Sequence, residues 1–297
     1  MCFALKLKCE AISVQSFFCY YAFIKDSGSN TTVFGLFIRK VVSKSMVMAC
    51  RRFLARDVVM NILPLGDLYS PLSQLSDVYC ALDEDQVVGV CAFYHAFRTP
   101  SIVFSGLTEE IRHVLIEKAL DGHSGQFVSL CSPGETFLFN RCAKILRLHR
   151  EQQMIAKSSR TFDYGDVKVE RVKKDELPFL DRFYVAHNAE AWTSVQFKTG
   201  PYYCVKQDGR IVSVAGVHLV TPQIAQLGNI VTDEAYRNRG FSTACTHALA
   251  AGLTSRGRIV SLFVRVDNAA AIHVYEKLGF QRVRDIVLLV AEKARNA

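Results

Sequence analysis

The sequence predicts an α/β protein, of the mixed-sheet α+β kind, built from two related halves in tandem. A strand–turn–strand pattern occurs twice in the 297 residues, at an offset of 124 residues. In the second half, a β-like strand, a basic glycine-bearing turn and a helix follow one another, and a second strand–helix pair comes after them. A chain of this length suffices for one large domain or two ordinary ones.

The composition is that of an ordinary folded protein, with 50% hydrophobic and 22% charged residues. These values exclude a largely disordered, collagen-like or coiled-coil chain. The formal net charge of +8 is uneven, because residues 1–57 contribute +6 of it and the rest of the chain is nearly neutral. A nucleic-acid-binding domain usually carries a basic face. We therefore expect no nucleic-acid partner.

The ten cysteines are scattered, and none belongs to a C-x-x-C pair or to a His/Cys cluster with zinc spacing. Several lie in apolar runs, as Cys91 does in Val90–Phe93, where a reduced cysteine behaves as a small hydrophobic residue. We therefore expect no bound metal and a reducing, cytoplasmic location.

We assign residues 1–45 to an amino-terminal extension that is disordered or foreign to the native chain. Its apolar run, Ala11–Ile24, is shorter than the about 20 residues that a membrane-spanning helix needs, so we expect no stable membrane span. The run lacks the A-x-A-like site of a signal peptide. Secretion and membrane attachment through this run stay as alternatives. Met46 and Met48 are alternative starting points of the chain.

The repeated pattern is a predicted β-hairpin, Val78–Phe93 in the first half and Tyr202–Val217 in the second. Aligned without gaps, the two segments share four identities: Tyr79 with Tyr203, Cys80 with Cys204, Val88 with Val212 and Val90 with Val214. A helix-like stretch precedes each hairpin, at Cys50–Leu63 and at Asp175–Ala189. We therefore predict tandem related domains. Two unrelated hairpins with the same turn chemistry are the alternative.

The first of these domains is expected over residues 46–157 and the second over 158–297. The first half continues with a strand at Ser101–Ser105, a helix from Thr108 to about Leu120 and a strand at Phe127–Cys131. No glycine-rich loop joins its strand to its helix, so we expect this half to have a structural role.

The second half contains a candidate anion site. Leu227–Thr232 is β-like, Arg237–Gly240 is a basic turn, and Ser242–Ala251 has the alanine-rich character of a helix that ends at Gly252. The free amides of a first helical turn point at the preceding loop, and the helix dipole favours negative charge there. Glycine lets the backbone approach a phosphate closely. An ordinary strand–turn–helix link is the alternative.

A second strand–helix pair follows. Ile259–Val266 is a hydrophobic strand, Asp267 and Asn268 supply an N-cap, and Ala269–Leu278 is a helix closed by Gly279. Ile272, Tyr275 and Leu278 form an inward stripe at helical spacing. Asn268 and Tyr275 are two helical turns apart, so both can face the same side.

These two segments carry a family resemblance. The run Arg237–Ser242 resembles the Q/R-x-x-G-x-G/A acetyl-CoA loop of the GNAT N-acetyltransferase superfamily, with Ser242 where the family has glycine or alanine. The run Asn268–Phe280 resembles that superfamily's N-x-x-A…Y-E-x-L-G-F helix. The resemblance covers residues 160–297. It implies tandem GNAT-like domains, the first degenerate and the second with splayed central strands and an acetyl-CoA loop.

The resemblance also implies residue roles. Tyr275 matches the general acid that protonates the departing thiolate, and a backbone N–H of Ile230 or Val231 would polarise the thioester carbonyl. A core tyrosine is the alternative for Tyr275. The implied acetyl-CoA contacts are Ile230, Val231 and Thr232 for the pantetheine arm, the amides of Asn238, Arg239, Gly240, Phe241, Ser242 and Thr243 beside Arg237 for the pyrophosphate, and Asn268.

The general base is not identified by the sequence. His218 is one candidate, and packing is its alternative. Glu190 lies in the segment His187–Trp192, where GNAT folds form their acceptor wall, and is either a contact for a cationic amine or a solvated loop residue. Asp233 and Glu234 are expected to cap or decorate a turn.

The predicted function is that of an acetyl-CoA-dependent N-acetyltransferase, which moves the acetyl group directly from the thioester to a primary amine without a covalent enzyme intermediate. A longer acyl-CoA is a close variant. A catalytically idle acyl-CoA-binding or scaffold protein is the alternative from another class. The acceptor and the oligomeric state are left open, because acceptor specificity depends on loops that vary on a shared scaffold.

Overall fold

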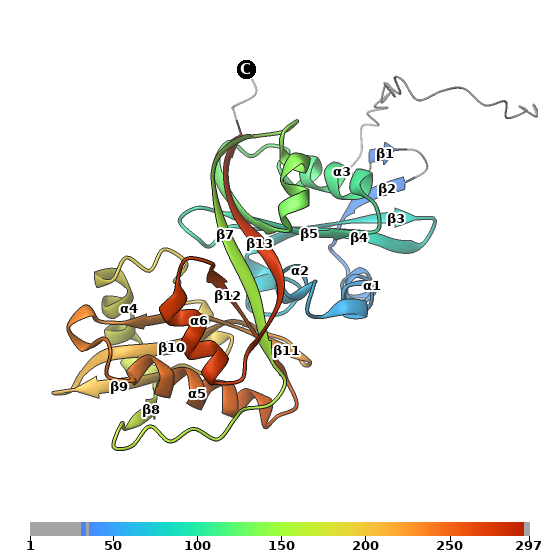
Figure 1. Cartoon of the computed structure of the whole chain (residues 1–297). Coiled ribbons are helices and arrows are strands. Elements are labelled where there is room, and N and C mark those ends of the chain that lie inside the picture. Colours follow the sequence, from blue (N-terminus) through green and yellow to red (C-terminus); the bar gives the residue numbers. More distant parts are fainter. Residues whose placement is uncertain (1–30, 34–35, 294–297) are drawn as a thin grey trace, which may run out of the picture.

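The computed structural model describes residues 31–33 and 36–293 of the chain. All strands in these ranges belong to one mixed sheet of 13 strands that runs through both halves of the molecule (Figure 1). The strand order across the sheet is β1-β2-β3-β4-β5-β6-β13-β7-β12-β11-β10-β9-β8. The apolar run Ala11–Ile24 lies outside the described residues.

From the hairpin onward the two halves have the same order of elements, with the short helix η3 in the first half where α6 stands in the second. Before the hairpin, the first half has two strands and two α-helices, and the second has one strand and one α-helix. The first half contains β1 (Thr31–Val33), β2 (Leu36–Lys40), α1 (Lys44–Leu54), α2 (Ile62–Gly66), β3 (Ser76–Asp83), β4 (Gln86–Tyr94), β5 (Ser101–Gly106), α3 (Glu109–Ala119), β6 (Gly125–Cys131), the 3-10 helix η3 (Pro133–Phe139) and β7 (Lys144–Ala156). The second half contains β8 (Val169–Arg171), α4 (Leu177–Ala186), β9 (Tyr203–Gln207), β10 (Arg210–Val220), β11 (Ile224–Thr232), α5 (Phe241–Thr254), β12 (Ile259–Arg265), α6 (Ala269–Lys277) and β13 (Gln281–Lys293). The predicted hairpins are β3–β4 and β9–β10, and the prediction of two tandem halves is confirmed.

The helical region before the first hairpin differs from the prediction of one stretch at Cys50–Leu63. Helix α1 already begins at Lys44, because the side chain of Ser43 caps it by accepting from the amide of Met46 at 3.2 Å. It ends at Leu54, and α2 follows as a separate helix. Between them, the carboxylate of Asp57 accepts from two backbone amides, which competes with continuous helix.

Residues 36–45, which the sequence-based prediction assigned to the extension, take part in this structure. Strand β2 pairs along its whole length with β3, from Leu36 opposite Asp83 to Lys40 opposite Tyr79. Ile38 is fully buried in the core of the first half. These residues therefore form the strand next to β3 and the start of α1.

Strands β7 and β13 join the two halves. They run side by side between them (Figure 1), and each has 13 residues. Strand β13, from the second half, also pairs with β6, while β7, from the first half, also pairs with β12. Each half therefore contributes its last strand to the sheet of the other. Neither strand was predicted, because the polar residues of β7, such as Arg147 and Glu151, hide the usual apolar alternation.

Helices cover the sheet of the first half on both faces. Helix α3 packs with Cys91 and Phe93 of β4, while α1 packs with Val90 and Ala92 of the same strand. Successive residues of a strand point to opposite faces, so α1 and α3 lie on opposite sides. The second half has one large core of its own. No helix among the described residues is long and apolar enough to cross a membrane.

Candidate functional site

The central strands of the second half separate, as the family resemblance implied. Strands β11 and β12 pair in parallel only over three positions, from Ile224 opposite Ile259 to Gln226 opposite Ser261. Beyond Gln226, the β12-facing side of β11 has no strand partner as far as Thr232. An unpaired strand edge offers backbone N–H and C=O groups to a ligand. The predicted contacts Ile230, Val231 and Thr232 lie on this free stretch.

A bulge bends β11 at the point where the strands separate. Its pairing with β10 shifts register between Val214 and Gly216, and Asn229 adopts a left-handed conformation with φ of 54°. The hydroxyl of Tyr184 donates to the Asn229 carbonyl at 2.6 Å. The Asn229 amide donates to Gln196 Oε1 at 2.8 Å. These contacts fix a backbone conformation that residues other than glycine seldom adopt.

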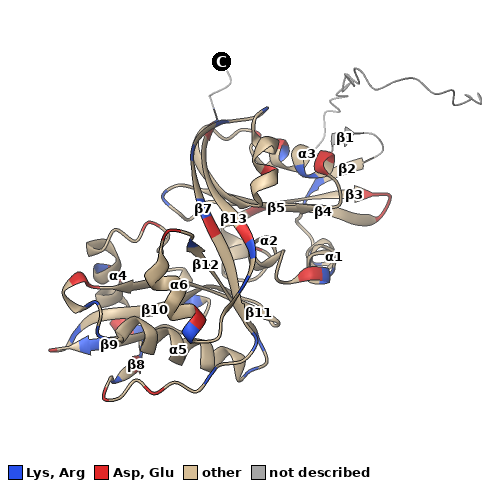
Figure 2. Cartoon of the chain, in the orientation of Figure 1, with Lys and Arg blue, Asp and Glu red and all other residues tan. Residues whose placement is uncertain are grey.

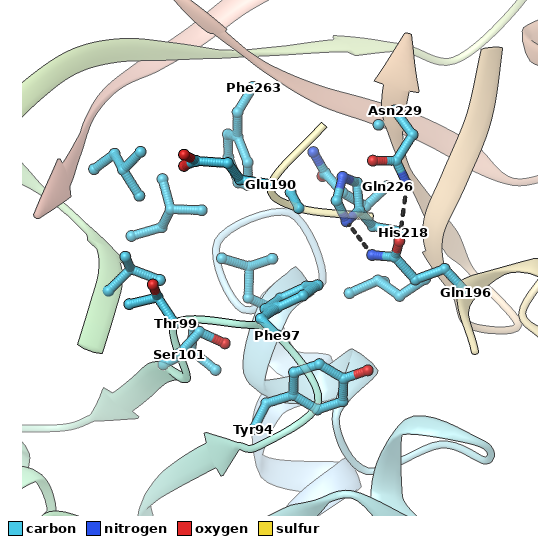
Figure 3. Close-up of a pocket in the computed structure, with 18 of the residues that line it drawn as sticks. Tyr94, Phe97, Thr99, Ser101, Glu190, Gln196, His218, Gln226, Asn229 and Phe263 are labelled. Atoms are coloured by element: carbon cyan, nitrogen blue, oxygen red, sulfur yellow. Dashed lines mark hydrogen bonds between the residues drawn. The ribbon is translucent and has the colours of Figure 1, made fainter. Parts of the chain in front are cut away.

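The same network reaches His218 on β10 (Figure 3). The Gln196 amide nitrogen contacts His218 Nδ1 at 2.6 Å. An amide nitrogen can only donate, so Nδ1 accepts and the ring proton lies on Nε2. Burial lowers the pKa of His218 to about 4, so the ring is neutral at physiological pH.

The turn between β11 and α5 leaves its backbone amides free. Asn238 and Gly240 have positive φ values of 61° and 75°, and Gly240 is the N-cap of α5 without a side-chain cap. The amides of residues 238–243 have no hydrogen-bond partner among the described residues. The start of a helix also carries a partial charge of about +0.5. The turn therefore has free donors suited to an anion, and its Gly240 adopts a φ that favours glycine.

The two arginines of this turn are exposed and only loosely held. Arg237 pairs with Glu234 at 3.0 Å, and both side chains are exposed. Arg239 donates to the carbonyl of Ala235 at 3.3 Å and stacks over the ring of Tyr236. Exposed pairs of this kind contribute little to stability. Both guanidinium groups can therefore turn toward an anion at small cost.

Helix α6 carries the two other predicted residues. The side chain of Asn268 caps the helix, because its Oδ1 accepts from the amide of Ala271 at 3.1 Å. Tyr275, two turns further on, is buried and lines the cavity described below. Burial raises the pKa of Tyr275 to about 12, so its hydroxyl keeps its proton at neutral and moderately alkaline pH.

A cavity of about 700 Å³ lies where β11 and β12 separate, and both halves line it. The second half contributes His218, Gln226 and Tyr275, and the first half contributes Asp67 and Phe97. Figure 3 shows part of this lining, with Phe97 and Tyr94 below and His218 and Gln226 above.

Of the candidate bases, the structure brings two to this cavity. His218 and Glu190 both line it, His218 half-buried and Glu190 exposed. Asp233 instead accepts from the amide of Ala235 and lies 3.4 Å from His187, while Glu234 pairs with Arg237. The two acidic residues therefore make local contacts at the turn after β11 and do not line the cavity. Sequence reasoning missed Asp67, Gln196 and Asn229 as site residues, because each takes its place only through contacts between segments distant in sequence.

Charges of both signs are spread over the two halves (Figure 2). Among the described residues, no group of three or more histidine, cysteine, aspartate or glutamate side chains is arranged to hold a metal ion. The site therefore consists of backbone amides, a phenol, a neutral imidazole and carboxylates.

Comparison with known proteins places these features in a family context. The family model described as FR47-like protein matches residues 208–288, which include β11, the turn and α6. Mycothiol acetyltransferase from Amycolatopsis mediterranei is 30% identical over 145 residues, covering 44% of this chain and 43% of its own. An alanine N-acetyltransferase for ribosomal protein bS18 from Escherichia coli is 31% identical over 105 residues, covering 35% and 65%. The chain thus spans less than two thirds of the length of these curated relatives.

The solved structures cover more of the chain. A tandem GNAT protein from the clavulanic acid biosynthesis pathway covers 88% of this chain with all of its own, at a TM-score of 0.58 and 14% identity. At that identity the likeness concerns the fold alone. It extends over both halves, in agreement with the tandem arrangement observed here.

Proposed function

The chain belongs to the GNAT acetyltransferase superfamily, and we propose that it is an acetyl-CoA-dependent N-acetyltransferase whose reaction takes place in the second half. One observation carries the proposal: the free edge of β11 leads at one end to the bare amides of residues 238–243 and at the other to the cavity lined by Tyr275. Acetyl-CoA has a pyrophosphate, which matches the free amides, and a thioester at the end of a long arm, which matches the cavity.

In this proposal the turn after β11 binds the pyrophosphate of acetyl-CoA. The amides from Asn238 to Thr243 donate to phosphate oxygens, and Arg237 and Arg239 add positive charge. The free backbone groups of Ile230, Val231 and Thr232 hold the pantetheine arm as an added strand. Asn268 contacts the cofactor from the start of α6.

The chemical step is a direct transfer. The nitrogen of a neutral primary amine attacks the thioester carbonyl, and the backbone N–H of Ile230 or Val231 stabilises the oxyanion that forms. The C–S bond then breaks as the amide forms. Tyr275 donates its proton to the departing thiolate, a role supported by a pKa raised through burial. The proton lost by the nitrogen leaves through solvent or a cavity residue.

His218 and Glu190 are the two candidates of the second half for this last proton transfer. Neutral His218 has its proton on Nε2 and its Nδ1 occupied by Gln196, so its ring has no free acceptor nitrogen. Glu190 is an exposed carboxylate at the cavity and has no ion-pair partner among the described residues. We therefore favour Glu190 as the residue that passes the proton to solvent.

The proposal is tested by two measurements on the purified chain. Calorimetry with CoA reports binding, and thiol release from acetyl-CoA in the presence of grouped amines reports turnover. We expect one bound CoA per chain and amine-dependent thiol release. Binding without turnover of any amine supports the idle acyl-CoA-binding protein instead. Absence of both contradicts the assignment.

A further inference from the structure

The cavity beside the transfer site is built jointly by the two halves. A cluster of buried apolar residues, Ile62, Leu72, Tyr94, Leu219 and Ile224, joins them. Helix α2 of the first half contacts both β10 and β11 of the second. A molecule that fills this cavity is therefore in contact with residues of both halves.

Gly66 brings α2 onto β10. It lies so close to Leu219 that a Cβ at this position would overlap the leucine side chain. The next residue, Asp67, is thereby held beside the second half, where it lines the cavity. Leu219 is adjacent in sequence to His218, which lines the same cavity.

Asp67 is a buried carboxylate without a partner. Only 7% of the residue is exposed, and no hydrogen bond or ion pair reaches its carboxylate from the described residues. Burial raises its pKa to about 7. An isolated buried carboxylate is costly, and such groups are normally paired. A cationic group placed in the cavity would supply the missing partner.

Gln226 of β11 is a second buried polar group at this cavity. It is 2% exposed, and its Oε1 has no hydrogen-bond partner. An amide oxygen only accepts hydrogen bonds, so it favours a donor such as an ammonium group. The two arginines that line the cavity, Arg98 and Arg147, are exposed. The buried part of the lining therefore favours a cation.

We propose that the cavity between the halves is the acceptor site, that it takes a small-molecule amine bound as a cation, and that Asp67 of the first half is the residue that pairs with the positive charge. The reacting nitrogen gives one proton to solvent before it attacks the thioester carbonyl as a neutral amine. This inference rests on the proposed acetyltransferase function. It gives the first half a part in acceptor binding rather than a purely structural role.

The test compares Asp67→Asn with wild type, and Asp83→Asn, an exposed aspartate at the β3–β4 turn, is the matched control. Four probes are used: 1,4-diaminobutane, phenethylamine, 4-aminobutanoate and a decapeptide with a free amino-terminal alanine. Initial rates with acetyl-CoA report transfer. Thermal unfolding with each probe in the presence of CoA reports binding without turnover.

We expect the two cationic amines to raise the unfolding temperature and to be acetylated with kcat/KM at least tenfold above 4-aminobutanoate and the decapeptide. Asp67→Asn is expected to lower kcat/KM for these amines at least tenfold, mainly through KM, and to abolish their stabilising effect. The affinity of Asp67→Asn for CoA is expected to equal that of wild type. The Asp83→Asn variant is expected to match wild type in kcat/KM and in its stabilisation by the amines.

The outcomes separate the two proposals. If the cationic amines stabilise wild type but not Asp67→Asn, and no amine is acetylated, the acceptor site is supported and the transferase function is contradicted. A decapeptide that is the better substrate overturns the inference while keeping the function. The inference is also overturned by unchanged KM in Asp67→Asn, or by cationic amines that neither bind nor react.

Discussion

Helices α3 and α5 follow corresponding strands in the two halves, yet their first turns are opposite in character. Helix α3 begins with Glu109 and Glu110, and the Thr108 side chain caps it by accepting from the amide of Ile111. Helix α5 begins after Gly240 with no side-chain cap, next to two arginines. Acidic residues in the first turn compensate the partial positive charge at the start of α3. The start of α5 has no such residues, so its partial positive charge is available to a bound anion.

The strands before these helices differ as well. Strands β5 and β6 also separate, because they pair at only two positions, Ser101 with Val128 and Ile102 with Ser129. However, β5 pairs with β4 without any register shift, whereas β11 has the bulge at Asn229. Separation of the strands is therefore common to both halves. The bulge, the bare amides and Tyr275 are specific to the second.

This difference indicates how one fold has two uses. The first half has acidic residues in the first turn of α3, where α5 of the second half has none, and its Asp67 lines the shared cavity. Substitutions in either half test this contrast.

Replacing Tyr275 with phenylalanine removes the phenol that the first half lacks, since η3 stands where α6 would be. We expect kcat to fall at least 100-fold with CoA affinity unchanged, because a general acid contributes about 10²- to 10⁴-fold. The wild-type pKa of about 12 predicts no loss of kcat from this group as pH rises from 6 to 10. Steady-state rates over this range check both points. Tyr79→Phe in the first half is the control, and equal rates for Tyr275→Phe and wild type would exclude the role.

Replacing Ser242 with glutamate gives α5 the acidic first turn of α3. We expect CoA affinity to fall about 100-fold, which equals about 2.7 kcal/mol, because the carboxylate repels the pyrophosphate and occupies its donors. Calorimetry measures the change. Ser255→Glu, at the other end of α5, is expected to bind CoA as wild type does. An unchanged affinity in Ser242→Glu would place the pyrophosphate elsewhere.

The bulge is tested with two substitutions at Asn229. Asn229→Ala removes both the side-chain contacts and the tolerance for positive φ, so we expect kcat to fall about tenfold through a displaced backbone donor. Asn229→Gly keeps access to positive φ and is expected to lose less. Comparison of kcat at saturating acetyl-CoA distinguishes the effects. Similar losses in both variants would indicate that the side-chain contacts, not the backbone conformation, matter.

The reverse exchange is expected to have the smallest effect. Changing Glu109 and Glu110 together to glutamine removes the acidic turn of α3, but the Thr108 cap and the regular β5 stay in place. We expect the stoichiometry in calorimetry to stay at one CoA per chain. A second bound CoA would show that charge alone separates the two halves.

Much of the site can be predicted from the sequence because its determinants are local. The hairpins, the turn with Gly240 and the capped helix from Asn268 each depend on residues within a few positions of one another. Their boundaries agree with the structure to within a few residues, although the β11 strand begins at Ile224 and α5 extends to Thr254. The roles of the residues on them stay predictions for the experiments above.

The repeated hairpin, the glycine turn before α5 and the place of Tyr275 on α6 can be read from the order of residues, because turn, cap and helix preferences act between neighbouring residues. The exchange of β7 and β13 between the halves, and the meeting of Asp67 and Gln226 at one cavity, become visible only in the folded chain. These arrangements depend on pairing and packing between segments more than 100 residues apart, such as Ile286 opposite Glu151 and Gly66 against Leu219. No local pattern encodes such contacts.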